Sequence, residues 1–162
     1  MWTSTESPVG TLRIIANRTA VTAIEFARPK NDSDWPGRPM GERDDAHPLL
    51  VETVRQLAAY FDRDLKEFDL PLEPAGTTFQ MSVWEQLQKI GYGETASYGE
   101  IATRLGMKVA ASRAVGLANG RNPIPIVIPC HRVVGANGTL TGYAGGIERK
   151  QILLELEQDA LL

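Results

Sequence analysis

The segment Ile124-Pro-Ile-Val-Ile-Pro-Cys-His-Arg-Val-Val134 leads a short apolar run into the only cysteine of the chain. Because its first proline cannot donate to a strand ladder, the run Ile124–Ile128 fits an edge strand or an irregular segment that threads the core. A cysteine held between a proline and a histidine at the end of such a run is poorly explained by packing alone. A reactive thiol at Cys130 is one interpretation, with His131 and Arg132 as candidates for lowering its pKa. A neighbouring Cys-His pair is by itself a weak motif, because adjacent side chains on a strand point to opposite faces.

Two short helices are expected upstream of this segment. Ser97 and Glu100 have the spacing of a capping box, and Gly106 provides a stop after the first helix. A second helix is expected over residues 110–118, which are mostly small and would let the helix backbone approach another surface closely. The short connection predicts a helix-turn-helix, although tight helix packing inside the domain would explain the small residues equally well.

A domain boundary is expected in the stretch Asp69–Gly76, which holds two prolines and a glycine and across which the charge balance changes. We assign residues 1–75 to an N-terminal domain and residues 76–162 to a C-terminal domain. The C-terminal domain should begin with a helix that Thr78 caps and Gly91 ends. The apolar face of that helix is expected to consist of Phe79, Val83, Leu87 and Ile90.

The N-terminal domain reads as a small α+β unit. The runs Thr11–Ala16 and Val21–Ala27 are rich in β-forming residues and predict a hairpin. Residues 28–46 collect prolines, glycines and charges, which predicts an irregular exposed connection. From Pro48, a helix is expected. Its apolar face should consist of Leu50, Val54, Leu57 and Phe61.

Length and composition limit the class of protein. The chain has 162 residues, of which 43% are hydrophobic and 23% charged, so it should form one or two compact domains. No run of 18 apolar residues occurs and the first residues lack the pattern of a signal peptide, so we expect a cytoplasmic protein without a membrane partner. One cysteine and two histidines rule out an internal disulfide and make a structural zinc site implausible.

Charge is unevenly distributed along the chain. The net charge of −3 argues weakly against a nucleic-acid partner. Residues 99–150, however, contain seven basic and two acidic side chains, whereas residues 1–75 contain nine basic and 13 acidic ones. The local excess of positive charge fits an anionic partner, and a solvated basic face explains it about as well.

Together with Arg121-Asn-Pro123 and Gly142-Tyr-Ala-Gly-Gly146, the string Ile128-Pro-Cys-His-Arg-Val-Val134 resembles the active-site signature of the O6-alkylguanine-DNA alkyltransferases. The resemblance covers nearly all of residues 77–162. Residues 1–75 are similar to the family's variable N-terminal domain only in length and in the hairpin-plus-helix pattern. The resemblance implies an α+β fold, with a small N-terminal α/β domain of ribonuclease H-like type and a C-terminal helical, winged-helix-like DNA-binding domain that carries the active site.

This resemblance implies DNA repair by direct reversal. Cys130 would take the alkyl group irreversibly from O6-alkylguanine, and less efficiently from O4-alkylthymine, in a nucleotide flipped out of duplex DNA. The protein would therefore be a single-turnover methyltransferase, because the alkyl group stays on its cysteine. The implied partner is double-stranded DNA containing O6-alkylguanine, bound by a monomer that can be cooperative on DNA. No cofactor and no metal are implied.

The family's catalytic roles fall on four residues. Glu157 would orient His131, which would act through water on Cys130 as the general base, and Asn122 would order the active-site turn. Without the resemblance, Glu157 would be read as a solvated carboxylate at a helix end and Asn122 as an ordinary turn residue. By helical spacing, Glu157 shares an apolar face with Lys150, Leu153 and Leu154.

The implied contacts to DNA fall on the helix-turn-helix. Arg113 would enter the base stack in place of the extruded nucleotide, and the Tyr98 hydroxyl would promote flipping. Without the resemblance, Arg113 would be a solvated charge and Tyr98 a half-buried aromatic residue. The surface lying in the minor groove would be formed by Ala110, Ala111, Ala114 and Gly116. The pocket for the base would be lined by Tyr143, Ala144 and Gly145.

Two departures from the family pattern and two alternative functions remain. Ala144 replaces a serine that some members use to contact O6, and the zinc site of some relatives is not expected here. A non-catalytic alkyltransferase-like protein that only binds the lesion is one alternative, and the presence of Cys130 argues against it. A cysteine hydrolase using Cys130 and His131 is the other, but it would need an oxyanion hole that nothing in the sequence indicates.

Overall fold

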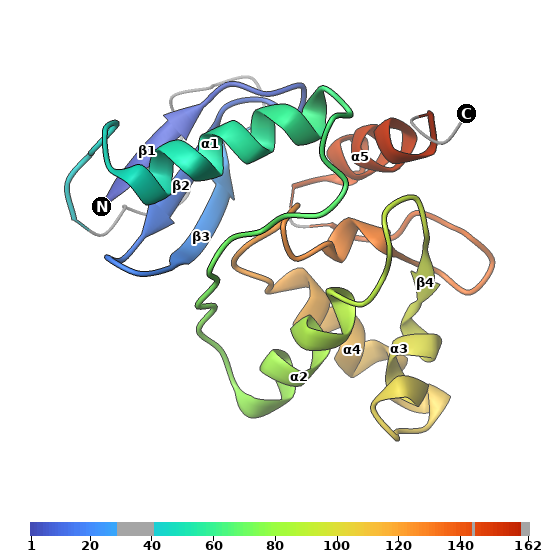
Figure 1. Ribbon diagram of the computed structural model, residues 1–162. Helices are drawn as coiled ribbons and strands as arrows, with labels where there is room; N and C mark the ends of the chain where they lie inside the picture. The colour runs from blue at the N-terminus through green and yellow to red at the C-terminus, as the bar shows by residue number, and fades with distance from the viewer. Residues whose placement is uncertain (29–40, 144, 160–162) are drawn as a thin grey trace. The chain divides into compact units, whose positions relative to one another are not determined.

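The computed structural model describes residues 1–28, 41–143 and 145–159. It divides into two compact units, Met1–Pro74 and Ala75–Leu162 (Figure 1). The first unit contains a small sheet and a helix, and the second is mainly helical, so the protein has the mixed α+β fold expected from the sequence. The division falls one residue before the expected domain boundary.

The first unit is built on a three-stranded antiparallel sheet with strand order β1-β2-β3. The strands are β1 (Trp2–Thr5), β2 (Leu12–Ala16) and β3 (Val21–Phe26). The predicted hairpin is confirmed as β2 and β3. The sequence analysis missed β1, because its four residues are mostly polar and show no alternation of buried and exposed side chains.

Helix α1 (Pro48–Phe61) lies across this sheet (Figure 1) and begins where expected. The imidazole of His47 caps its start by accepting a hydrogen bond from the backbone N–H of Leu49 at 3.2 Å. The predicted buried face was partly wrong, because Val54 and Phe61 are only half-buried. The face that is buried consists of Leu50, Thr53, Gln56, Leu57 and Tyr60.

Part of the predicted connection between residues 28 and 46 falls on residues 29–40, which lie outside the described residues. At its far end, Arg43 donates to the Asp45 carboxylate at 2.8 Å, and Asp45 also accepts from the Thr3 hydroxyl at 2.7 Å. These bonds attach the end of the connection to β1.

The second unit carries the remaining helices and a two-stranded parallel sheet. Its helices are α2 (Thr78–Leu87), α3 (Tyr98–Arg104), α4 (Ser112–Gly120) and α5 (Ile147–Asp159), with short 3-10 helices η1 (Val109–Ala111) and η2 (Cys130–Arg132). Strand β4 (Ala96–Ser97) pairs with β5 (Val133–Val134). Because β5 directly follows η2, this pairing attaches the active-site turn to the start of the helix-turn-helix.

Helix α2 is capped one residue earlier than predicted. The Thr77 hydroxyl accepts from the backbone N–H of Gln80 at 3.1 Å, and the Gln80 side chain accepts from the backbone N–H of Thr77 at 2.9 Å. This reciprocal capping box makes Thr77, and not Thr78, the N-cap residue of the helix. The helix also ends before Ile90, which was expected on its apolar face. The glycine that has a left-handed backbone conformation after the helix is Gly93, with φ of 77°, and not Gly91 as expected.

The predicted helix-turn-helix is confirmed as α3 and α4. The Ser97 hydroxyl caps α3 by accepting from the backbone N–H of Glu100 at 3.1 Å, and Gly106 ends the motif's first part with φ of 75°. The helix expected over residues 110–118 is divided into η1 and α4. The indole N–H of Trp84 donates to the carbonyl of Ala118 at 2.9 Å, which fastens α4 to α2.

The apolar run before the cysteine forms turns and no strand. Ile124, Ile126 and Ile128 are at most 1% exposed, so the segment threads the core, and the edge-strand alternative was wrong. The backbone N–H of Ile128 donates to the carbonyl of Ile124 at 2.9 Å, and Ile126 has φ of 74°. The left-handed residue closes a turn that an extended strand could not make.

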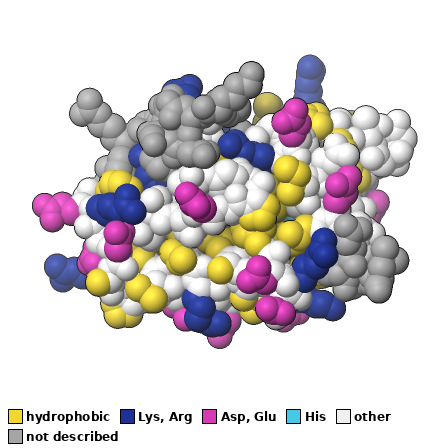
Figure 2. Space-filling model, turned by 90° about the horizontal axis from the view of Figure 1, so that it is seen from above, with side chains coloured by type: hydrophobic (Ala, Val, Ile, Leu, Met, Phe, Trp, Pro, Cys, Tyr) yellow, Lys and Arg dark blue, Asp and Glu magenta, His cyan; other side chains and the backbone are white. Residues whose placement is uncertain are grey.

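The surface carries a mixture of charges. On the face seen in Figure 2, lysine and arginine side chains are interspersed with aspartate and glutamate side chains. This distribution agrees with the small net charge of the chain, −3.

Candidate active site

The candidate site is centred on Cys130, which is the first residue of η2 and is 2% exposed. Successive side chains on a 3-10 helix are about 120° apart, whereas those on a strand point to opposite faces. Because Cys130 and His131 lie on a 3-10 turn and not on a strand, their side chains need not point to opposite faces. Pro129 precedes the turn and β5 follows it.

Two asparagine side chains hold the backbone around the cysteine. The amide of Asn122 donates to the carbonyl of Ile128 at 2.8 Å and accepts from the backbone N–H of Ile124 at 3.0 Å. The amide of Asn119 donates to the carbonyl of Cys130 at 3.3 Å. Both asparagines are buried, so these bonds are shielded from water. The sequence analysis singled out Asn122 and missed Asn119, which lies at the end of α4.

Opposing effects act on the pKa of the Cys130 thiol. Burial raises its pKa, while hydrogen bonds to the side chains of Asn122 and Tyr143 and the charge of Lys150 lower it. Burial has the larger effect, so the thiol is protonated at neutral pH. A base must therefore remove the proton before the sulfur can act as a nucleophile.

His131 and Glu157 form a buried pair beside the thiol. His131 Nε2 lies 2.6 Å from Glu157 Oε2, and the two side chains are 0% and 1% exposed. Burial lowers the pKa of His131, which leaves the imidazole neutral. Burial alone would raise the pKa of Glu157, but hydrogen bonds and charges from His131 and Arg132 outweigh it and hold the pKa at about 2.

The protonation of this pair follows from these facts. An ionised carboxylate can only accept, so Nε2 of the neutral His131 carries the proton and Nδ1 has a lone pair. Nδ1 is buried and has no hydrogen-bond partner in the part of the chain that the structure describes. The ring therefore has an unused basic nitrogen, as a general base requires.

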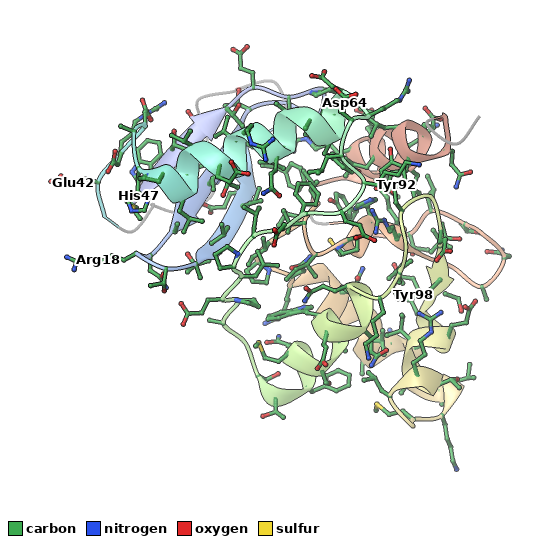
Figure 3. All side chains as sticks on the ribbon, in the orientation of Figure 1. Arg18, Glu42, His47, Asp64, Tyr92 and Tyr98 are labelled. Atoms are coloured by element: carbon green, nitrogen blue, oxygen red, sulfur yellow. The ribbon has the colours of Figure 1, made fainter. Side chains whose placement is uncertain are left out.

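Arg132 acts on Glu157 and not on the thiol, so the expectation that it lowers the pKa of Cys130 was wrong. Its Nε donates to Glu157 Oε1 at 2.8 Å and its Nη2 to Oε2 at 3.1 Å. Its Nη1 donates to the carbonyl of Ile90 at 2.6 Å, and its guanidinium lies 5.8 Å from the ring centre of Tyr92, which Figure 3 labels. Glu157 is thus bound by a guanidinium and an imidazole together.

Lys150 is the second cation buried in this unit, and the sequence analysis assigned it no role. It is 0% exposed, and its Nζ donates to the carbonyls of Val133 at 2.5 Å and Thr141 at 3.2 Å. Its seven-residue distance from Glu157 on one helical face was visible in the sequence. That spacing did not reveal its contacts, because both acceptors lie outside α5.

The residues expected to contact DNA are placed on the helix-turn-helix. Arg113 and Ala114 are exposed on α4, whereas Ala111 and Gly116 are half-buried. Tyr98, labelled in Figure 3, is the first residue of α3. A Cβ at position 116 would lie 3.6 Å from the ring of Tyr98, which is an ordinary van der Waals contact, so α4 passes close to that ring.

The expected base pocket is partly described. The Tyr98 hydroxyl lies 2.8 Å from the hydroxyl of Thr141, so the start of α3 touches the loop that leads to Tyr143. Gly145 is buried and its carbonyl accepts from the guanidinium of Arg149 at 3.4 Å. Ala144 lies outside the described residues.

Within the described ranges 1–28, 41–143 and 145–159, no group of three or more histidine, cysteine, aspartate or glutamate side chains could hold a metal ion. Over the same ranges, no helix has the length and apolar character needed to cross a membrane.

Fold and site together define a protein with a buried free cysteine, a buried imidazole–carboxylate pair that starts from the next residue, and a helix-turn-helix upstream of both. Both units match models of one family. Residues 78–159 match the DNA binding domain of 6-O-methylguanine DNA methyltransferase, and residues 1–74 match the ribonuclease-like domain of the same family. The chain belongs to the 6-O-methylguanine DNA methyltransferase family.

Curated relatives agree over nearly the whole chain. It is 48% identical over 152 residues to a methylated-DNA–protein-cysteine methyltransferase of Methanosarcina acetivorans, and the match covers 94% of both chains. It is also 48% identical over 153 residues to the protein of the same name from Mycolicibacterium paratuberculosis, covering 94% of this chain and 89% of that one.

Solved structures agree with this assignment. The structure of Mycobacterium tuberculosis OGT in complex with DNA superimposes with a TM-score of 0.83 at 45% identity, covering 98% of this chain and 93% of that one. An O6-methylguanine DNA methyltransferase from Methanococcus jannaschii gives a TM-score of 0.67 at 28% identity, with the same coverage.

Proposed function

We propose that this protein repairs DNA by direct reversal, accepting the alkyl group of O6-alkylguanine on Cys130 in a single turnover. The observation that carries the proposal is the buried Cys130 thiol next to the His131–Glu157 pair, in a unit that matches the DNA binding domain of the family. O4-alkylthymine, which also presents an alkylated exocyclic oxygen, would be a poorer substrate of the same site.

The reaction needs one proton acceptor and one electron-pair acceptor. Nδ1 of His131 takes the thiol proton, through a water molecule, and the Glu157 carboxylate stabilises the imidazolium that forms. The Cys130 sulfur then attacks the alkyl carbon. The new S–C bond forms as the C–O6 bond breaks, and its electron pair returns to the guanine. The guanine recovers one proton, so the thiol proton is accounted for and the thioether remains.

Asn122 supports this step by holding the turn. Its two hydrogen bonds, to Ile128 and Ile124, fix the backbone immediately before Cys130. A nucleophile whose backbone cannot move loses less freedom on reaching the alkyl carbon. Tyr143, Ala144 and Gly145 would line the pocket that receives the base.

Binding to duplex DNA would use η1 and α4. Small side chains at Ala111, Ala114 and Gly116 suit the narrow minor groove, and the exposed Arg113 can enter the stack in place of the flipped nucleotide. The Tyr98 hydroxyl, at the start of α3, would assist the flip. We expect the protein to bind DNA as a monomer, with cooperativity between molecules measurable by sedimentation on long duplexes.

We place the protein in the cytoplasm. The reacting group is a free thiol, and the chain has no second cysteine to protect it, so a reducing compartment suits it. Fractionation of cells that express the full chain would test this location.

The test is incubation of the protein with duplex DNA that carries a labelled methyl group on O6 of one guanine. We expect one label per protein molecule, lost when Cys130 is replaced by serine. Binding without label on the protein would indicate a lesion-binding protein that does no chemistry. Release of label with repeated turnover would indicate a hydrolase.

A further inference from the structure

Lys150 is buried in a place where a lysine is costly. Its side chain is 0% exposed, in the first turn of α5, and it forms no ion pair with a carboxylate in the described part of the chain. Its ammonium donates to the neutral carbonyl oxygens of Val133 and Thr141. A buried ammonium that is not balanced by an anion loses several kcal/mol of hydration, in order of magnitude. A buried ammonium of this kind is expected to have an anionic partner.

The buried charges of this unit show which partner is missing. Among the described residues they are Arg132, Lys150 and Glu157, with His131 neutral. Arg132 and Glu157 neutralise each other through two hydrogen bonds. Lys150 is then the one positive charge among them without an anionic partner while the Cys130 thiol is protonated. When the thiol proton moves to His131, the thiolate that forms supplies an anion for Lys150, and the imidazolium is paired with Glu157.

We propose that Lys150 is a positioning residue for the alkyl transfer: its ammonium is the countercharge of the Cys130 thiolate, and it holds the strand after the nucleophile against the pocket loop. This inference rests on the proposed function. It adds a residue that neither the sequence motif nor the His131–Glu157 pair includes.

The electrostatic part is supported by the surroundings of the thiol. The side chains that act on the Cys130 thiol are Asn122, Tyr143 and Lys150. The other buried titratable or charged groups of this unit are His131, Arg132 and Glu157, which act on one another. The imidazole and the phenol are uncharged at neutral pH, and the guanidinium and carboxylate cancel. Lys150 is the charge that acts on Cys130, and the charge of Cys130 acts back on Lys150. The coupling is reciprocal, as linkage requires.

The mechanical part is supported by the two carbonyls. Val133 is the first residue of β5, directly after η2, and Thr141 lies on the loop before α5. The hydroxyl of Thr141 is in turn 2.8 Å from the hydroxyl of Tyr98. Lys150 therefore links the strand after Cys130 to the loop that touches the helix-turn-helix, through a buried bond to Val133 and a partly buried bond to Thr141.

The test compares Lys150→Met, Lys150→Arg and the control Lys89→Met, which removes an exposed lysine. Each is reacted with iodoacetamide and, separately, with free O6-benzylguanine from pH 6 to pH 10. For Lys150→Met, we expect the pH midpoint of both reactions to rise by at least one unit, so that the rate near pH 7.5 falls about tenfold and recovers at high pH. Lys150→Arg should keep the original midpoint, and Lys89→Met should match the unaltered protein.

A rate for Lys150→Met that falls equally at every pH, or that does not fall, would overturn the countercharge role. If Lys150→Met does not fold, the unaltered protein decides the matter by NMR titration of the Lys150 ε-carbon before and after S-methylation of Cys130. The pKa of Lys150 should drop once the anion can no longer form, and an unchanged value would overturn the proposal. Reaction with iodoacetamide but never with O6-benzylguanine would contradict the proposed function alone.

Discussion

His131 Nε2 lies 2.6 Å from Glu157 Oε2, and the two side chains, 26 residues apart in the sequence, are both shielded from solvent. Arg132 donates to both oxygens of the same carboxylate, so Glu157 is ionised although it is buried. The carboxylate also accepts from the backbone N–H of Gly93 at 3.2 Å. A charge held by this many donors can orient the imidazole and stabilise its protonated form, while Nδ1 is left for the thiol.

The pKa of Glu157 predicts how stability depends on pH. It is about 2 in the folded protein and near 4.5 in an unfolded chain, so the carboxylate stabilises the fold above pH 4.5 and this contribution is lost as the pH falls toward 2. Glu157→Gln should therefore lower the free energy of unfolding by about 3 kcal/mol at pH 7, and the difference from the unaltered protein should shrink below pH 4.5. Denaturant unfolding at a series of pH values would measure it.

Glu155→Gln is the matched control, since Glu155 is exposed on the same helix. It should change the free energy of unfolding by no more than about 0.5 kcal/mol. A difference between Glu157→Gln and the unaltered protein that is the same at pH 3 and pH 7 would show that the carboxylate's charge does not stabilise the fold.

Cys130→Ser should abolish alkyl transfer and preserve binding to alkylated duplex DNA. A serine hydroxyl has a far higher pKa than a thiol and nearly the same shape, so it removes the nucleophile with little change in the fold. Transfer is measured with labelled DNA and binding by fluorescence anisotropy. Residual methyl transfer by this variant would exclude Cys130 as the acceptor.

Arg113→Ala should impair repair of duplex DNA more than reaction with free O6-benzylguanine. Flipping a nucleotide costs a few kcal/mol, so loss of the side chain that replaces it should slow duplex repair by about 100-fold. The free base needs no flipping and should react at the original rate. Arg18→Ala, which removes an exposed arginine from the β2–β3 turn, is the control (Figure 3). Equal losses on both substrates would assign Arg113 to the chemistry or the fold.

Affinity for undamaged DNA should depend only moderately on salt. Two of the seven basic residues in the range 99–150, Arg132 and Lys150, are buried and cannot meet phosphates. Five contacts at most, each contributing about −0.9, give a slope of log affinity against log salt no steeper than about −4 or −5. Minor-groove edges carry little sequence information, so duplexes of different sequence should bind alike.

Titration of several undamaged duplexes at increasing salt concentrations would measure this slope. A value near −10, typical of a strongly basic repressor, or a large preference for one sequence would mean that α4 reads DNA in another way.

The sequence by itself determined the elements whose signals are local. The hairpin of β2 and β3, the start of α1 and the helix-turn-helix all followed from periodicity, turn residues and caps within a few positions of one another. The sequence did not distinguish Thr77 from its neighbour Thr78 as the N-cap of α2, and the hydrogen bonds in the structure show that the N-cap is Thr77. The string around Cys130 also predicted the family to which the chain belongs, through its resemblance to the family's active-site signature and not through the Cys-His pair alone.

Tertiary structure alone decided what surrounds the cysteine. The run Ile124–Ile128 gave no sign that it would form turns, since a short apolar run suits a strand or a buried irregular segment equally. Arg132 binds Glu157, 25 residues away, and Lys150 reaches Val133, 17 residues away. A side chain's charge state depends on burial and on such distant neighbours, and neither is encoded in local spacing. The sequence therefore singled out Cys130 as the candidate nucleophile, and only the fold determined which charges act on it.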